Sequence, residues 1–142
     1  MAISDGQYTV SIGAGGEDGL GYVNIVLPQV NFPEFYNADL IENLIVHLTD
    51  VVDLTSAYSI TDSVFDAVVD FDKKHDIQIG WVNYFKNKEV LKYMPIDVQC
   101  KTLPKGVMLR LSDEISKPSE ALLKRSIDIR DALGELGLLE TQ

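Results

Sequence analysis

Four aspartates in the middle of the chain are spaced so that they can share one surface: Asp62, Asp66, Asp70 and Asp72. On a helix, residues four apart share a face, and on a strand alternate residues do so. Gathered carboxylates can steer a basic partner, hold a magnesium ion or simply face water. We interpret these residues as a partner-binding set, and we keep a small magnesium-dependent enzyme as the weaker alternative.

Nucleophilic catalysis needs a serine or cysteine beside a general base, and few such bases are present. The chain has two histidines, His47 and His75, and one cysteine, Cys100. Neither histidine stands in a catalytic motif, and no second histidine or cysteine is placed to share a metal with it. Cys100 falls within an expected strand and is predicted to be a small buried side chain. We therefore predict that the protein is not an enzyme and assign it no catalytic residue, metal or cofactor.

Aromatic side chains cluster shortly after the aspartates, at residues 81–85. Exposed tryptophan and tyrosine side chains are common hot spots of protein interfaces. Trp81 and Tyr84 are therefore predicted to anchor the contact that the aspartates would steer. Packing of both side chains in the core is the competing interpretation, because residues 77–85 also have the composition of a buried strand.

Charge is distributed unevenly along the 142 residues, which carry a net charge of −10. Residues 1–80 hold 13 acidic and two basic side chains (net −11), and residues 81–142 hold 9 acidic and 10 basic ones (net +1). Such a balance argues against direct binding of nucleic acid and against docking on an anionic membrane. An acidic surface either keeps the protein soluble or receives a basic partner.

The sequence has neither the pattern of a signal peptide nor an apolar run long enough to cross a membrane, so we expect a cytoplasmic protein. A glycine-rich stretch at residues 13–21 fits neither nucleotide-binding fingerprint and is predicted to be a hairpin loop. The elements that must position the candidate residues follow from hydrophobic periodicity, caps and turn signals.

Strands are predicted at 7–12, 22–27, 57–61 and 77–85, with a hairpin of 97–103 and 107–111 around Pro104, Lys105 and Gly106. Helices are predicted at 38–52, 88–93 and 118–136, and Asn37 is positioned to cap the first. That first helix is expected to bury one apolar stripe, made of Leu40, Ile41, Leu44, Leu48 and Val51. Residues 62–74 fit a helix capped by Thr61 or Asp62 better than a strand. The whole chain is predicted to be a single α+β domain, 1–142, in which two or three helices cover an antiparallel sheet.

Three segments together resemble the immunity protein 52 family of bacterial polymorphic-toxin systems. They are residues 79–85 (IGWVNYF), 103–112 (LPKGVMLRLS) and 132–139 (ALGELGLL). The family pairs a Gly-Trp-x-x-Tyr segment with a later glycine-led strand and a C-terminal helix ending in Gly-Leu-Leu. The resemblance covers residues 38–140 and departs from the family at Lys105, where a second glycine is expected.

This resemblance implies a small cytoplasmic antidote without catalysis of its own. The implied partner is a cognate toxin, a nuclease of restriction-endonuclease-like fold delivered by a type VI or related secretion system. The acidic half of the chain would then imitate the phosphates that a basic nuclease cleft attracts. An acidic DNA-mimic inhibitor of host or phage origin draws on the same charge and remains the alternative.

Overall fold

A computed structural model describes residues 2–4, 9–13, 22–26, 37–73, 75–113 and 119–140. The chain divides into two compact units, residues 1–36 and residues 37–142. The first unit contains strands β1 (Ala2–Ser4), β2 (Thr9–Gly13) and β3 (Tyr22–Val26), joined as an antiparallel sheet in the order β1-β2-β3. Most of the predicted glycine-rich loop lies outside the described residues. The assignment of 1–142 to one domain stays a prediction.

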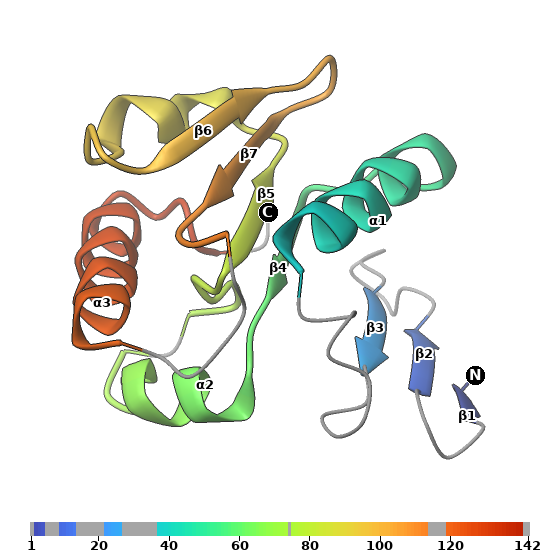
Figure 1. Ribbon diagram of the computed structural model, residues 1–142, viewed down its shortest axis with the longest axis horizontal. Coiled ribbons are helices and arrows are strands. Elements are labelled where there is room, and N and C mark those ends of the chain that lie inside the picture. The colour runs from blue at the N-terminus through green and yellow to red at the C-terminus, as the bar shows by residue number, and fades with distance from the viewer. Residues whose placement is uncertain are drawn as a thin grey trace. The chain divides into compact units, whose positions relative to one another are not determined.

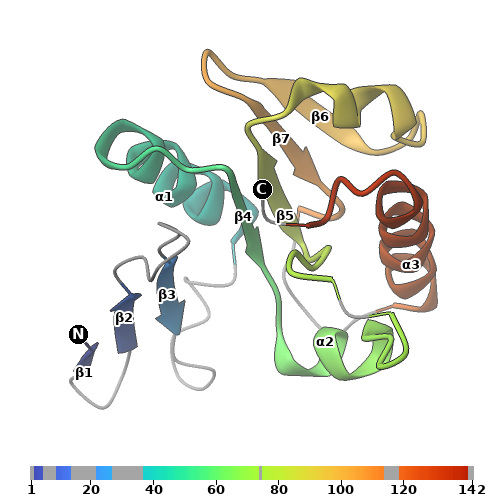
Figure 2. The same cartoon turned by 180° about the vertical axis from the view of Figure 1, so that it is seen from behind.

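The second unit contains a four-stranded antiparallel sheet in the order β4-β5-β7-β6. Its strands are β4 (Ser56–Ser59), β5 (Val82–Phe85), β6 (Gln99–Thr102) and β7 (Val107–Arg110). The helices are α1 (Ala38–Val51), α2 (Asp62–Val68), the 3₁₀ helix η2 (Lys88–Tyr93) and α3 (Glu120–Glu135). Figures 1 and 2 both place the sheet between α1 and α3. The predicted α+β class is confirmed for this unit.

Helices α1 and α3 each begin directly after a capping side chain, Asn37 as predicted and Ser119, which was not predicted. The Asn37 side chain accepts a hydrogen bond from the backbone N–H of Asp39 at 2.8 Å, and α1 follows. Ser119 does the same for α3 through the N–H of Leu122 at 3.1 Å. Each capping side chain accepts a hydrogen bond from a backbone N–H that has no partner inside its helix. Residues of this type therefore mark where a helix begins in the sequence.

The buried face of α1 differs from the predicted stripe. The side chains of Ala38, Ile41, Ile45 and Thr49 are buried, whereas Leu40 is 38% exposed and Val51 is 79% exposed. Apolar residues cover more of the surface of α1 than the sheet can contact, so two neighbouring stripes of side chains could have been buried. The buried stripe is rotated by about 100° around the helix axis from the predicted one, which corresponds to one residue along the helix. Part of the apolar surface of α1 therefore remains in contact with water.

The C-terminal Gly-Leu-Leu segment follows α3 and contributes a buried side chain to the core. Gly137 adopts a φ of 69°, a left-handed conformation that suits glycine and ends the helix. The chain then turns back, and Leu139 is fully buried. The backbone N–H of Ile77 donates to the carbonyl of Leu139 at 3.0 Å. This segment of the family resemblance therefore has a folding role.

Candidate partner-binding surface

The four candidate aspartates lie on α2 and on the loop that follows it. Thr61 caps α2 by accepting from the N–H of Val64 at 3.4 Å, so the helix interpretation is confirmed for residues 62–68. Asp62, Asp66 and Asp72 are exposed, and Asp70 is half-buried. We call the exposed part of residues 62–73 the α2 surface.

Asp70 shapes the loop at the end of this surface. Its carboxylate accepts hydrogen bonds from the backbone N–H groups of Asp72 at 3.0 Å and Lys73 at 3.2 Å. The hydrogen bond from Asp72, above all, lowers the pKa of Asp70, because it favours the ionised carboxylate. Among the residues that the structure describes, no three acidic, histidine or cysteine side chains meet closely enough to hold a metal ion. The four aspartates therefore do not gather into one cluster of three or more ligands, and the magnesium-dependent enzyme stays an alternative.

Two phenylalanines also belong to the α2 surface. Phe71 is 76% exposed and Phe65 is 37% exposed, whereas Val64 and Val68 are buried and hold the helix on the core. An exposed phenylalanine between carboxylates has the chemistry of an interface anchor. Phe71 was not predicted as an anchor, because the sequence does not show where the helix in this stretch ends. α2 ends at Val68, so Phe71 lies in the loop beyond the helix.

Trp81 and Tyr84 are not exposed anchors. Their side chains are 2% and 1% exposed, so the core-packing interpretation is confirmed and neither can touch a partner docked on this surface. Both follow Gly80, where an added Cβ would lie 1.9 Å from the backbone oxygen of Ser59. The side chain of Asn83 accepts from Gly80 N at 2.8 Å and donates to Gly80 O at 2.9 Å.

These contacts explain why the predicted strand 77–85 is observed only as β5, residues 82–85. The two hydrogen bonds from the Asn83 amide use the backbone groups of Gly80 that a sheet ladder would otherwise use. The Gly-Trp-x-x-Tyr segment is therefore a determinant of the fold, and an interface must be sought elsewhere.

Acidic residues of α1 are paired with bases from the second half of the chain. Arg110, on β7, contacts Glu42 and Asp39 at 2.7 Å and Asp113 at 3.1 Å. The hydrogen bond with Glu42, above all, raises the pKa of Arg110. The guanidinium is 13% exposed and the Glu42 carboxylate 15%, so this pair is largely withdrawn from water. The charge of α1 is thus partly neutralised within the fold.

The α2 surface is different in this respect. No ion pair joins Asp66, Asp70 or Asp72 to a base within the described ranges of the chain. Asp66 and Asp72 therefore keep negative charge that is available to an incoming cation. The sequence shows the excess of acid but not which acids are paired.

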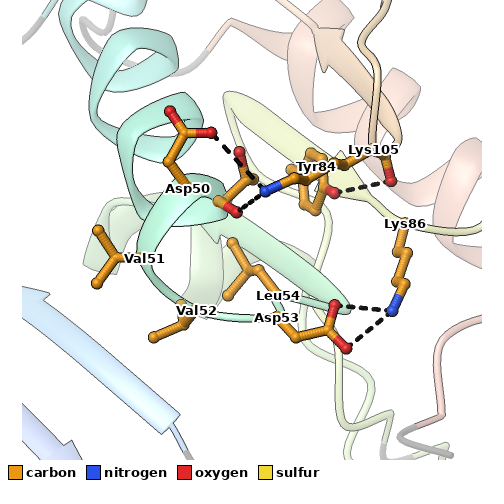
Figure 3. Close-up of a pocket in the computed structure, with 9 residues that line it drawn as sticks. Asp50, Val51, Val52, Asp53, Leu54, Tyr84, Lys86 and Lys105 are labelled. Carbon is orange, nitrogen blue, oxygen red and sulfur yellow. Dashed lines mark hydrogen bonds and ion pairs between the residues drawn. The ribbon is translucent and has the colours of Figure 1, made fainter.

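A shallow pocket of about 350 Å³ lies at the C-terminal end of α1 (Figure 3). We call it the α1 pocket; residues 49–54, Tyr84, Lys86 and Lys105 line it. Lys105 donates to the carbonyl of Thr49 at 2.7 Å, and Lys86 donates to Asp53 at 2.7 and 3.0 Å. Lys105, where the family resemblance expects a glycine, therefore serves as a cation at the C-terminal end of a helix.

The histidines and the cysteine do not form a nucleophile–base pair. His47 contacts the carbonyl of Asn43 at 2.7 Å, and His75 contacts the carboxylate of Glu140 at 2.8 Å. The prediction that Cys100 is buried is wrong, because all four residues of β6 are exposed. β6 lies at the edge of the four-stranded sheet, and the sequence does not show which strand lies at the edge.

None of the described helices is both long enough and apolar enough to cross a membrane. Models of known protein families give no match to this chain, and a search of curated proteins gives none. The resemblance to the immunity protein 52 family stays a prediction that rests on the motifs quoted above.

Proposed function

We propose that this chain is an immunity protein that binds a cognate bacterial polymorphic toxin and neutralises it without catalysis. The toxin would be a nuclease, and the α2 surface would approach its basic cleft. The single observation that carries the proposal is that Asp66 and Asp72, on the surface that also exposes Phe71, are exposed and make no ion pair within the described part of the chain.

The physical argument has two parts. Exposed carboxylates attract a basic cleft over several ångströms and so raise the rate of encounter. Phe71, at 76% exposure, offers apolar area that becomes buried once the surfaces meet. The carboxylates would supply the steering predicted from the sequence, and Phe71 would supply the anchor that had been predicted at Trp81 and Tyr84.

The family resemblance supports the same proposal. It covers residues 38–140, and the second compact unit is residues 37–142. Its Gly-Trp-x-x-Tyr and Gly-Leu-Leu segments build the core of this unit. Related immunity proteins would then share a fold and differ on exposed surfaces, where each toxin is recognised.

The first experiment is an affinity pull-down at low salt: the full chain is tagged and incubated with lysate of its source cells, and the retained proteins are identified by mass spectrometry. The expected result is a large protein with a C-terminal nuclease domain, recovered in an amount equimolar to the tagged chain. Recovery of host DNA-binding proteins would favour the DNA-mimic alternative. Failure to retain a toxin that is present in the lysate would overturn the proposal.

The second experiment measures association of the recovered nuclease domain with the variant Asp66→Lys/Asp72→Lys. The control is Asp128→Lys/Glu135→Lys, which makes the same change in net charge on the exposed side of α3. We expect the first variant to slow association about tenfold or more at low salt and the control to slow it far less. Equal slowing would show that total charge, rather than the α2 surface, attracts the toxin.

A further inference from the structure

The charged groups of the α1 pocket are already paired with one another (Figure 3). Lys86 is held by Asp53, and Lys105 bonds the Thr49 carbonyl and lies 3.8 Å from Asp50. The backbone carbonyl of Lys105 accepts from the hydroxyl of Tyr84 at 3.1 Å. Hydrogen bonds thus hold the polar wall of the pocket and leave little unsatisfied charge for an occupant.

The opposite wall is aliphatic. Val51 is 79% exposed, Val52 is 39% exposed and Leu54 is half-buried. Figure 3 shows Val51 and Val52 away from both lysines, with no polar contact drawn to either. Burial of this apolar surface away from water is the favourable change that the pocket still offers.

We infer that the α1 pocket receives one aliphatic side chain of the partner protein, and this inference rests on the proposed function because the partner is the toxin. The paired charges match an uncharged occupant, since a charged one would have to break an ion pair or remain unpaired. The surrounding pairs Lys86–Asp53 and Lys105–Asp50 would then form the polar rim that shields a buried anchor from water.

A protein side chain suits this pocket better than a small molecule. Small-molecule sites enclose most of the ligand and aim several unsatisfied polar groups at it. Here the lining side chains of Asp50, Asp53, Lys86 and Lys105 are half or more exposed, and their polar groups are committed to one another.

The test on the free chain uses isobutanol, an analogue of the leucine side chain, with amide chemical shifts as the readout. We expect saturable shifts at residues 51–54 at millimolar concentrations. Isobutylammonium and isovalerate, charged probes of similar shape, should give far weaker ones. Stronger binding of either charged probe, or no saturable shift with isobutanol, would overturn the inference.

The test on the complex compares Val51→Asp with Ile96→Asp. Val51 is mostly exposed, and Ile96 is fully exposed but lies in the segment between η2 and β6. We expect Val51→Asp to raise the dissociation rate of the recovered toxin about tenfold or more and Ile96→Asp to leave it unchanged. If wild type binds the toxin and Val51→Asp dissociates at the wild-type rate, the pocket inference fails and the proposed function stands. If no toxin binds wild type, both fail.

Discussion

Helices α1 and α2 are both acidic, and they use their carboxylates in opposite ways. Arg110, Lys86 and Lys105 pair with acids on α1 and on the turn that follows it. The exposed acids at positions 66 and 72 of the α2 surface have no such ion pair in the described part of the chain. A count of acidic residues therefore overstates the charge that a partner meets at α1. We expect α1 carboxylates to act on stability and α2 carboxylates to act on binding.

The largest expected effect is on stability, from the change Arg110→Met. It leaves Glu42 and its neighbours without their cation, at a site that is mostly withdrawn from water. We expect the free energy of unfolding to fall by about 3 kcal/mol, as for other largely buried pairs that lose one partner. Urea denaturation measures this loss. Lys92→Met, at an exposed pair with Glu89, is the control and should cost about 0.5 kcal/mol or less.

If Arg110→Met lowered the free energy of unfolding by less than about 1 kcal/mol, the expectation that the α1 carboxylates act on stability would be wrong. It would mean that the three carboxylates find water or other partners without strain. Asp39 and Asp113, which are 76% and 66% exposed, are the two that water reaches.

The next effect is on dissociation, from the change Phe71→Ser on the α2 surface. Phe71 is mostly exposed in the free protein, so its removal should change the free energy of unfolding by less than about 0.5 kcal/mol. We expect the toxin complex to dissociate about tenfold faster. Surface plasmon resonance gives the rate, and Ile96→Ser serves as the matched exposed control. Similar rates for both variants would remove Phe71 from the interface.

A smaller effect on the association rate distinguishes α1 from α2 when one negative charge is removed from each. Asp66→Asn and Asp39→Asn each remove one negative charge, but only Asp39 is engaged by Arg110 in the free protein. We expect the association rate constant at low salt to fall about two- to threefold for Asp66→Asn and to stay near wild type for Asp39→Asn. Stopped-flow association with the nuclease domain measures both. The reverse order would place the electrostatic contact on α1.

The smallest effect concerns the acid dependence of stability at Asp70. The backbone hydrogen bond from Asp72 lowers the folded-state pKa of this carboxyl below its ordinary value of 3.8. Ionised Asp70 therefore stabilises the fold fully above that value, and the contribution is lost as the pH falls through the lower folded-state pKa. Urea unfolding between about pH 5 and about pH 2 should show a shallower loss for Asp70→Asn than for wild type. Identical slopes would show that the loop does not depend on this ionisation.

Much of the local structure could be predicted from the sequence, because its causes lie within a few residues. Asn37 caps α1 through the residues next to it, Gly137 ends α3, and the turn at residues 104–106 joins β6 to β7. At Gly106 an added Cβ would lie 2.4 Å from the backbone oxygen of Phe85, so the glycine there also has a tertiary reason. The α+β class followed from these elements together.

The site was less predictable, for reasons that individual residues make clear. The aspartates were found because charge spacing is visible in the sequence. Trp81 and Tyr84 were assigned to the surface, but both are buried, Tyr84 on β5, an inner strand between β4 and β7. Phe71 was overlooked because its exposure depends on where α2 ends. Cys100 was misplaced because only the strand order of the sheet makes β6 an edge.

The sequence by itself determined most of the helices and strands of residues 37–142, several of their caps and turns, and the excess of acid in the first half of the chain. Tertiary structure alone decided which of those acids are neutralised. The pair of Arg110 with Asp39 joins residues 71 positions apart, and that of Lys86 with Asp53 joins residues 33 apart. Pairing across such separations depends on how strands and helices pack, and no local pattern of residues encodes it. The available charge of the α2 surface is therefore a property of the fold.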